Sequence, residues 1–366
     1  MNIYIAILLI WLLISSLIQY CRFSIKIKGI VHCTITQREL IVLLFVLLFG
    51  SLLSFRGLDV GYDTRFYSQM FMDIGSFDDI TKYYMFVKAP VYVILCKLVY
   101  LISDAPNAMM IFSGFSTVCI TAYFINKKSE DVVFSLFLFV ALDFYLFSFN
   151  GSRQMLSLAL LLIVYMLWDE GKIKSGLMFL MLATGIHITA LLFIAVLPLF
   201  MYKINYKRFL GVNAFIFVVE MLAMKFLSIF QKFFDSYSNL NEMGYNLTTG
   251  DSSGGRVVYA LIFIIIELLV FNYNKKQVKW AYSPEFLRLS TIVNVSLISM
   301  ILYRHYYVFA RVEKVFFVFG ILLLPTIYKH LINRDSRWIV KVLTYIVFMI
   351  PFITQTLKYL PYSIFW

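Results

Sequence analysis

Residues 132–149 read VVFSLFLFVALDFYLFSF, and residues 153–168 read RQMLSLALLLIVYMLW, with only Asn150-Gly151-Ser152 between them. A helix needs about 20 predominantly apolar residues, with a lower limit of roughly 17, to cross the hydrocarbon core of a bilayer. Two such runs joined by a short polar turn predict two adjacent membrane-spanning helices.

The rest of the chain has the same character. Of its 366 residues, 61% are apolar or aromatic and 14% are charged, against roughly 25% charged residues in soluble domains. The mean hydropathy is +0.84. One water-soluble core cannot hide this much apolar surface, so the composition excludes a soluble enzyme, a nucleic-acid-binding domain and a disordered chain.

Apolar runs are spread along the whole sequence. We predict full membrane-spanning helices at about 3–21, 40–55, 108–125, 132–149, 153–168, 209–226, 256–272, 286–303, 308–328 and 338–357. Two further runs are interrupted, 83–102 by Lys88 and Pro90 and 176–200 by His187, so we expect partial or re-entrant segments there. The predicted fold is an all-α polytopic membrane bundle of about ten full transmembrane helices and two partial segments, in a single domain.

The basic residues predict the orientation. If the interrupted runs do not cross, the basic connectors fall on one side: 22–38, 127–128, 172–174, 203–208, 275–279 and 329–337. The positive-inside rule makes this side cytoplasmic and explains the net charge of +12 without nucleic acid. Residues 2–20 lack a preceding basic segment, which predicts an uncleaved first span with its N-terminus outside. In this single domain, residues 1–366, the outer loops 56–82 and 227–255 form the expected active-site face, with short amphipathic helices.

Two kinds of chemistry have no signature in the sequence. The four cysteines, Cys21, Cys33, Cys96 and Cys119, show neither CxxC nor Cys/His spacing, so no disulfide framework or zinc site is expected. The sequence also lacks DxD, HExxH, GxSxG and Walker motifs. We therefore expect no metal and no cofactor, and an energy source that lies in the substrate itself.

Ionisable residues gather on the predicted outer face. They are Arg56, Asp59, Asp63, Arg65, Arg153, His187, Arg256, Arg304, His305 and Arg311. Charged groups at a membrane boundary are costly and mark functional sites. Arginine presents a planar fork of donors that fits phosphate oxygens in a bidentate manner. The cluster therefore predicts a site for an anionic lipid headgroup such as a diphosphate.

Ordinary structural roles compete with this interpretation. In the structural interpretation, the side chains of Arg56 and Arg65 extend to the lipid headgroups. His187 packs within its apolar run. Ser152 is the expected cap of a helix whose first turn holds Arg153, although a cation there opposes the helix dipole. Arg256 is an alternative anchor for the loop before it. Glu313 is expected to pair with Arg304, Arg311 or Lys314.

Three further carboxylates, Asp143, Glu220 and Glu267, fall inside predicted spans. In a transporter such residues relay protons. Because each is isolated from other charges in the sequence, hydrogen bonds between helices are the more common explanation.

An ordered series of motifs resembles the EpsG-like branch of the O-antigen polymerase (Wzy-type) family. The series is Arg56-Gly-Leu-Asp-Val-Gly-Tyr-Asp63-Thr-Arg-Phe-Tyr67, Ser152-Arg153-Gln154-Met-Leu-Ser-Leu-Ala159, Gly185-Ile-His187-Ile-Thr-Ala190, Gly255-Arg256, and Arg311 followed by Phe316-Phe317 and Pro325. Thr189 stands where the family usually has serine. Val315-Phe316 and the extra His305 also depart from the pattern, which leaves Arg304 and Arg311 as alternative counterparts of one family arginine.

The resemblance implies a metal-independent, inverting glycosyltransferase. It would join undecaprenyl-diphosphate-linked oligosaccharide repeat units into O-antigen or a related surface polysaccharide, on the outer face of the cytoplasmic (inner) membrane. Arg56, Arg153 and Arg256 are then the expected phosphate contacts, and Asp63, Asp59 or His187 is the base or its orienting partner. Arg65, Tyr67, Arg304, His305 and Arg311 are the other expected contacts to substrate. Membrane lipids and a chain-length regulator protein are the other implied partners.

Two alternative functions use the same features. An O-antigen ligase-like transferase employs similar arginine and histidine chemistry, but it usually carries a larger exterior domain. A flippase or transporter of lipid-linked oligosaccharide would use the carboxylates within the spans, and inverted repeats are expected in such a protein. No repeat is visible in the sequence.

Overall fold

The computed structural model describes residues 2–21, 25–27, 33–225, 253–272, 278–302, 307–331 and 337–364. Contacts within the chain group into two units, Met1–Leu191 with Arg334–Trp366 (unit 1) and Leu192–Asn333 (unit 2). Each unit is described by itself, and the single domain expected from the sequence stays a prediction. Most of the predicted outer loop 227–255 lies outside the described residues.

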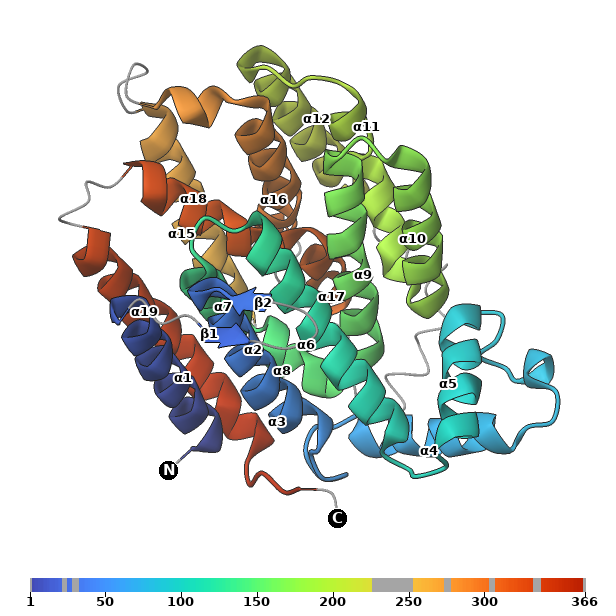
Figure 1. Cartoon of the computed structure of the whole chain (residues 1–366). Helices are drawn as coiled ribbons and strands as arrows, with labels where there is room; N and C mark the ends of the chain where they lie inside the picture. The colour runs from blue at the N-terminus through green and yellow to red at the C-terminus, as the bar shows by residue number, and fades with distance from the viewer. Residues whose placement is uncertain are drawn as a thin grey trace. The chain divides into compact units, whose positions relative to one another are not determined.

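Unit 1 is a bundle of helices with one small hairpin (Figure 1). Its elements are α1 (Ile3–Tyr20), β1 (Ile25–Ile27), β2 (Cys33–Ile35), α2 (Gln37–Phe45), η1 (Val46–Gly50), α3 (Ser51–Ser54), α4 (Thr64–Ser76), η2 (Ile80–Lys82), α5 (Pro90–Ile102), α6 (Ala108–Lys128), α7 (Val132–Ala141), α8 (Phe144–Asn150), α9 (Ser152–Asp169), α10 (Ile173–Ile186), α19 (Arg337–Thr356) and η6 (Leu357–Tyr359). The antiparallel hairpin β1–β2, which pairs Ile25 with Ile35, was not expected from the sequence.

Unit 2 is helical throughout its described part. After η3 (Ile188–Val196), which begins in unit 1, it contains α11 (Pro198–Met201), α12 (Tyr206–Lys225), α15 (Ser253–Asn272), η5 (Lys279–Tyr282), α16 (Pro284–Leu302), α17 (Tyr307–Phe317) and α18 (Gly320–Leu331). The all-α polytopic class predicted from the sequence is thus confirmed.

Seven helices of the described residues are long and apolar enough to cross a membrane. They are Ile3–Tyr20, Gln37–Ser54, Ala108–Lys128, Ser152–Asp169, Gly255–Asn272, Pro284–Leu302 and Arg337–Tyr359. The bent pair α7–α8 makes an eighth if it counts as one span. Two of the ten predicted spans, 209–226 and 308–328, are not among these helices. The first corresponds to α12, which contains the charged residues Lys207, Arg208 and Glu220. The second is divided at Val318 and Phe319 into α17 and α18.

The bend in the span 132–149 has a local cause. Asp143 adopts the left-handed conformation, with φ of 67°, and separates α7 from α8, whose axes differ by 44°. Aspartate is one of the few residues other than glycine that tolerate this backbone conformation. The sequence predicted a span here but not its bend.

The two interrupted runs hold short helices, as expected. Pro90 occupies the first turn of α5, where its missing N–H costs nothing. Ser54 Oγ donates to the Ile111 carbonyl at 3.3 Å, so α3 ends and α6 begins at the same end of unit 1. The intervening segment 83–102 therefore does not complete a crossing. In the second run, α10 ends at Ile186 and η3 begins at Ile188, so His187 does interrupt it.

Both chain termini lie at one end of unit 1, which we call the loop end. There Asn2 Nδ2 donates to Thr356 Oγ1 at 2.6 Å, and the Gly57 N–H donates to the Ser363 carbonyl at 2.8 Å. The turn at Asn150 belongs to the same end, because Asn150 Nδ2 donates to the Tyr359 hydroxyl at 3.0 Å. Figure 1 shows both termini at this end.

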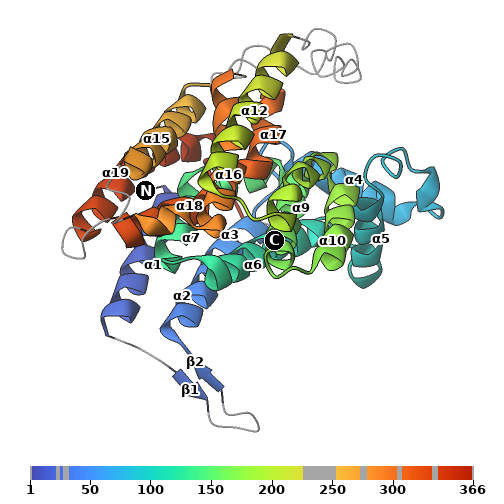
Figure 2. The same ribbon diagram turned by 90° about the horizontal axis from the view of Figure 1, so that it is seen from above.

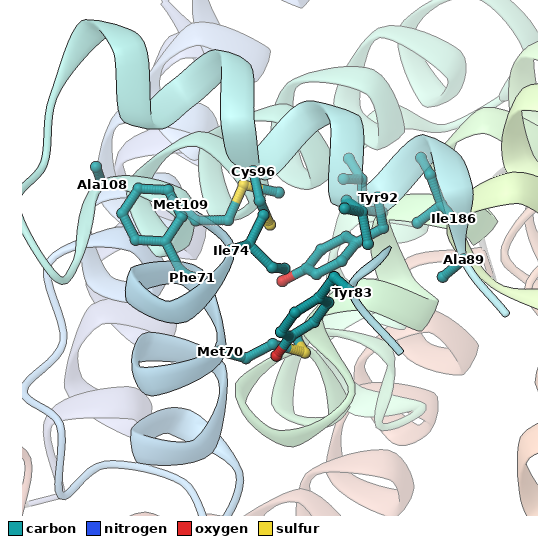
Figure 3. Packing of buried hydrophobic residues seen from close by; sticks show 12 residues of the cluster. Met70, Phe71, Ile74, Tyr83, Ala89, Tyr92, Cys96, Ala108, Met109 and Ile186 are labelled. Atoms are coloured by element: carbon teal, nitrogen blue, oxygen red, sulfur yellow. The ribbon is translucent and has the colours of Figure 1, made fainter. Parts of the chain in front are cut away.

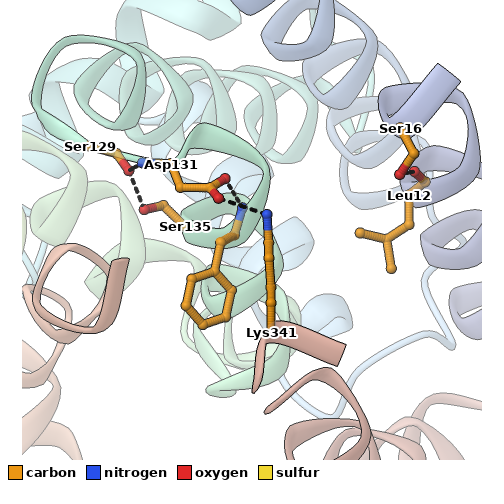
Figure 4. Close-up of polar contacts among 7 residues, drawn as sticks. Leu12, Ser16, Ser129, Asp131, Ser135 and Lys341 are labelled. Atoms are coloured by element: carbon orange, nitrogen blue, oxygen red, sulfur yellow. Dashed lines mark hydrogen bonds and ion pairs between the residues drawn. The ribbon is translucent and has the colours of Figure 1, made fainter. Parts of the chain in front are cut away.

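The opposite end is called the hairpin end, because β1 and β2 project from it beyond α1 and α2 (Figure 2). Lys128 pairs there with Asp169 at 2.5 Å. Lys341 of α19 pairs at 2.6 Å with Asp131, the residue that caps α7, next to Ser129 and Ser135 (Figure 4). Arg38 donates to Asn126 Oδ1 at the same end, whereas Lys97 donates to the Gly75 and Phe77 carbonyls of the loop 56–82. Lysine and arginine therefore occur at both ends, and the orientation of the ends in the membrane stays a prediction.

The amphipathic helix expected in the loop 56–82 is α4, but its apolar face does not meet lipid. Met70, Phe71 and Ile74 are buried against α5 residues Tyr92 and Cys96 in one hydrophobic cluster, which also includes Leu156 of α9 and Ile186 of α10 (Figure 3). The helix that carries the candidate loop residues is therefore held by the protein core.

The separation of the two ends gives a test of orientation. In a chain whose native cysteines are replaced by serine, a cysteine at exposed Tyr62 should react with a membrane-impermeant maleimide added to intact cells. A cysteine at exposed Lys127 should react only after lysis, because the hairpin end is predicted to be cytoplasmic. The reverse labelling pattern would invert the predicted topology.

Candidate functional site

Arg56 is the most buried cation of unit 1, with 1% of its surface exposed. Its Nη1 donates to the Leu53 carbonyl at 2.5 Å, its Nη2 to the Phe149 carbonyl at 3.3 Å and its Nε to Thr64 Oγ1 at 3.3 Å. The guanidinium also lies 5.2 Å from the centre of the Phe149 ring. Burial lowers the pKa of Arg56 to about 10, so the group stays charged at neutral pH.

This environment gives Arg56 a structural role. Its guanidinium donates to two carbonyls and one hydroxyl, and it thereby fastens the end of α3, the start of α4 and the end of α8 to one another. The phosphate contact expected of Arg56 stays a prediction.

The other candidates in this loop lie nearer the surface. Asp59 is exposed and accepts a hydrogen bond from Ser363 Oγ, and Arg65 is exposed on α4. Asp63 is half-buried at the residue before α4. Tyr67 is half-buried and packs against the cluster that contains Tyr92.

Arg153 lies in the first turn of α9. The helix cap is Gly151 rather than the predicted Ser152, and Gly151 has no side chain that could bond the first N–H groups of the helix. A Cβ atom at position 151 would also collide with the Phe147 ring, which would have to shift. The positive end of the helix dipole and the Arg153 cation therefore lie together.

The guanidinium of Arg153 has unused donors. It lies 5.6 Å from the centre of the Tyr92 ring, a cation–π contact that leaves its N–H groups available. Its Nε and Nη1 are buried, and among all residues that the structure describes none accepts a hydrogen bond from either atom. Buried donors in native proteins almost always have partners, so the two unpaired atoms make Arg153 a candidate for contact with water, an ion or a ligand.

His187 lies level with Arg153 on the neighbouring helix. The helices α9 and α10 run antiparallel, and Ser157 Oγ donates to the Ala183 carbonyl at 2.8 Å. Arg153 is one turn before Ser157, and His187 is one turn after Ala183, so both lie one turn beyond this contact toward the loop end.

Thr189 contacts one nitrogen of His187. Its Oγ1 lies 2.8 Å from His187 Nδ1, and its backbone N–H donates to the same nitrogen at 3.4 Å. A backbone N–H can only donate, so this contact favours the neutral tautomer whose proton is on Nε2.

The remaining candidates belong to unit 2. Arg256 of α15 forms an ion pair with Glu313 of α17 at 3.2 Å, and only 2% of the Glu313 side chain is exposed. Arg256 was not among the partners expected for Glu313 from the sequence, which were Arg304, Arg311 and Lys314. Arg311 is half-buried on α17. Arg304 and His305 lie outside the described residues.

Two carboxylates within the spans bond to serines on α16. Ser290 Oγ donates to Glu267 of α15 at 2.8 Å, and Ser299 Oγ donates to Glu220 of α12 at 3.0 Å. The hydrogen bonds between helices that we expected for these glutamates are confirmed.

The structure thus gathers part of the predicted set in unit 1. Arg56, Asp59 and Asp63 share one loop, and Arg153 and His187 lie at the same level on neighbouring helices. The sequence analysis did not identify Tyr92 or Ser363. Tyr92 lies in an interrupted apolar run, where the sequence does not distinguish a functional aromatic residue from a packing one. Ser363 lies far along the chain from its partners, so no motif connects them. Within the described ranges, no group of three or more His, Cys, Asp or Glu residues is placed to hold a metal ion.

The fold and site define a polytopic helical membrane protein with an unpaired arginine at the loop end of unit 1. The chain belongs to the EpsG family, whose model matches residues 39–364. This membership supports a membrane polymerase of the glycosyltransferase type that acts in polysaccharide synthesis. No curated protein and no solved structure matches the chain.

The two arginines of the loop end should respond differently to substitution. Arg56→Ala leaves buried carbonyl groups without donors, so it should lower the free energy of unfolding by about 3 kcal/mol. Arg65→Ala, which removes an exposed arginine from the adjacent helix, should change it by less than about 0.5 kcal/mol. Thermal unfolding in detergent measures both, and an Arg56→Ala protein as stable as the parent would refute the structural role.

Proposed function

We propose that this protein lengthens a surface polysaccharide by joining undecaprenyl-diphosphate-linked oligosaccharide repeat units on the outer face of the cytoplasmic membrane. Family membership supports the polymerase class. The observation that carries the proposal is Arg153, whose unpaired Nε and Nη1 lie at the uncapped start of α9. The oxygen atoms of a diphosphate can accept hydrogen bonds from both Nε and Nη1.

In the proposed reaction, an acceptor hydroxyl attacks the anomeric carbon of the donor glycan. The bond from this carbon to the diphosphate oxygen breaks, the configuration inverts, and the hydroxyl proton passes to a base. Negative charge develops on the departing diphosphate, where fixed cationic donors lower the barrier without a metal. Arg153 is the proposed donor group, and His187, at the same level on the neighbouring helix, is a further proposed contact to the substrate.

The proposed base is a carboxylate. Asp63 is the preferred candidate because it is half-buried at the residue before α4, in the loop that also carries Asp59. Arg65 and Tyr67 on the same helix are proposed contacts to the glycan. In unit 2, Arg256 and Arg311 remain candidates for the second substrate, with Arg256 held by Glu313. A chain-length regulator protein stays a predicted partner.

The transporter alternative is weakened by Glu220 and Glu267, because both bond to serine hydroxyls within the described part of unit 2. The ligase-like alternative shares the Arg153 chemistry. A gel of surface polysaccharide from a deletion strain separates all three. Loss of polymerase leaves one repeat unit on the final acceptor, loss of ligase leaves none there, and loss of a flippase retains the precursor inside the cell.

Substitution of Arg153 tests the proposal. Arg153→Ala should abolish long chains while single repeat units persist, and Arg153→Lys should lengthen chains roughly 10–100 times more slowly because lysine keeps the charge but not the planar fork. Lys127→Ala is the matched control, since Lys127 also lies over an aromatic ring, Tyr123, at 5.7 Å but at the hairpin end. Normal long chains from Arg153→Ala would reject the assignment.

The role of Thr189 is tested by two substitutions of similar size. Thr189→Val removes Oγ1 and should slow chain lengthening about tenfold and shift its pH dependence, because the His187 ring loses the contact that orients it. Thr189→Ser keeps the hydroxyl and should behave as the parent. Rates measured in membrane vesicles over a pH series show both effects, and a Thr189→Val profile equal to that of the parent contradicts the proposed orientation.

A further inference from the structure

The last described segment, residues 359–364, runs beside the loop that carries Arg56 and Asp59; we call it the C-terminal strap. The Gly57 N–H donates to the Ser363 carbonyl at 2.8 Å, and Arg56 forms an isolated antiparallel bridge with Ile364. These are backbone contacts between parts of the chain about 300 residues apart, and they lie immediately next to the buried Arg56 guanidinium.

Side chains of the strap extend these contacts. The Tyr362 hydroxyl donates to the Leu52 carbonyl at 2.8 Å, and Ser363 Oγ donates to Asp59. The Tyr359 hydroxyl accepts from Asn150 Nδ2 at 3.0 Å, in the turn that precedes α9. One short segment therefore bonds to the end of α3, to the candidate loop and to the residue three positions before Arg153.

We propose that the C-terminal strap positions the catalytic loop, with Ser363 as a positioning residue. The inference rests on the proposed function of the loop end. Residues 55–63 belong to no regular helix, so the loop depends on outside partners to fix its backbone. The strap supplies them at Gly57 and Asp59, and Asp59 acts as the anchor of the strap rather than as the base.

The close approach of the two segments explains why residue 57 is glycine. A Cβ atom built on Gly57 would collide with Ser363 Oγ and would also press on Asp59 Oδ1. Asp59 Oδ1 ends an exposed side chain that can turn away. Ser363 Oγ must also rotate away, which breaks its hydrogen bond to Asp59, and Ser363 Cβ, at 3.1 Å, leaves a new side chain at position 57 little room.

This contact can be tested by a rescue experiment in the living cell. Gly57→Ala should displace the strap and reduce long-chain polysaccharide at least tenfold, seen on a gel of surface polysaccharide. The double variant Gly57→Ala with Ser363→Gly removes the colliding atoms and should recover at least half of the parental long chains. Ser363→Gly alone measures the independent cost of losing the hydroxyl, so that the four strains form a double-mutant cycle.

Two results would overturn the inference. One is a Gly57→Ala strain with parental chain lengths. The other is a Gly57→Ala defect that the second substitution does not relieve. If Gly57→Ala prevents folding, size-exclusion profiles of the membrane extract replace the gel, and restoration of the folded peak by Ser363→Gly reports the same contact. An Arg153→Ala strain on the same gel distinguishes failure of the strap inference from failure of the proposed function. If the proposed function is wrong, Arg153→Ala gives long chains. If only the strap inference is wrong, Arg153→Ala still lacks them.

A second pair of variants separates positioning from simple stability. Ser363→Ala keeps the backbone bond to Gly57 but loses the hydrogen bond to the Asp59 carboxylate, and it should slow lengthening roughly tenfold with an unchanged amount of folded protein. Ser363→Thr keeps the hydroxyl and should restore the parental rate. If Ser363→Ala lengthens chains at the parental rate, Ser363 is not a positioning residue.

Discussion

The buried Arg56 guanidinium is the constraint on which the loop end of unit 1 depends. Removing a cation from water costs several kcal/mol unless its donors are satisfied. Here Leu53, Thr64 and Phe149 provide the acceptors. They come from the ends of three helices, α3, α4 and α8, so a charged group that cannot be left unsatisfied brings these ends together. Phe149 directly precedes the turn into α9, and the same cation therefore sets where Arg153 begins its helix.

The sequence predicted those features that arise from local pattern. Runs of apolar residues located most spans, since a helix in a bilayer must satisfy its own backbone and present apolar side chains to lipid. The break at His187 and the start of α5 at Pro90 were also predicted, because each depends on one residue that interrupts an apolar run.

Features that depend on distant partners were not predictable in this way. An arginine at the end of a span can reach outward to headgroups or inward to carbonyls, and only the fold brings the Phe149 carbonyl to Arg56. The strap contacts join residues about 300 positions apart without any motif. The bend at Asp143 depends on one backbone conformation that many aspartates do not adopt. The ion pair between Glu313 and Arg256 joins residues 57 positions apart and was not expected from the sequence.

The contrast between two arginines explains how one end of a bundle can be both stable and reactive. Each nitrogen of the Arg56 guanidinium donates to a protein acceptor and the residue is buried, so Arg56 has a structural role. Arg153, four residues beyond the Phe149 carbonyl that holds Arg56, keeps two donors unpaired beside the uncapped start of α9. Leaving buried donors unpaired costs stability, and such a cost persists only where the surrounding structure holds the group in place. In the proposed reaction, the unpaired donors of Arg153 meet a diphosphate when substrate binds.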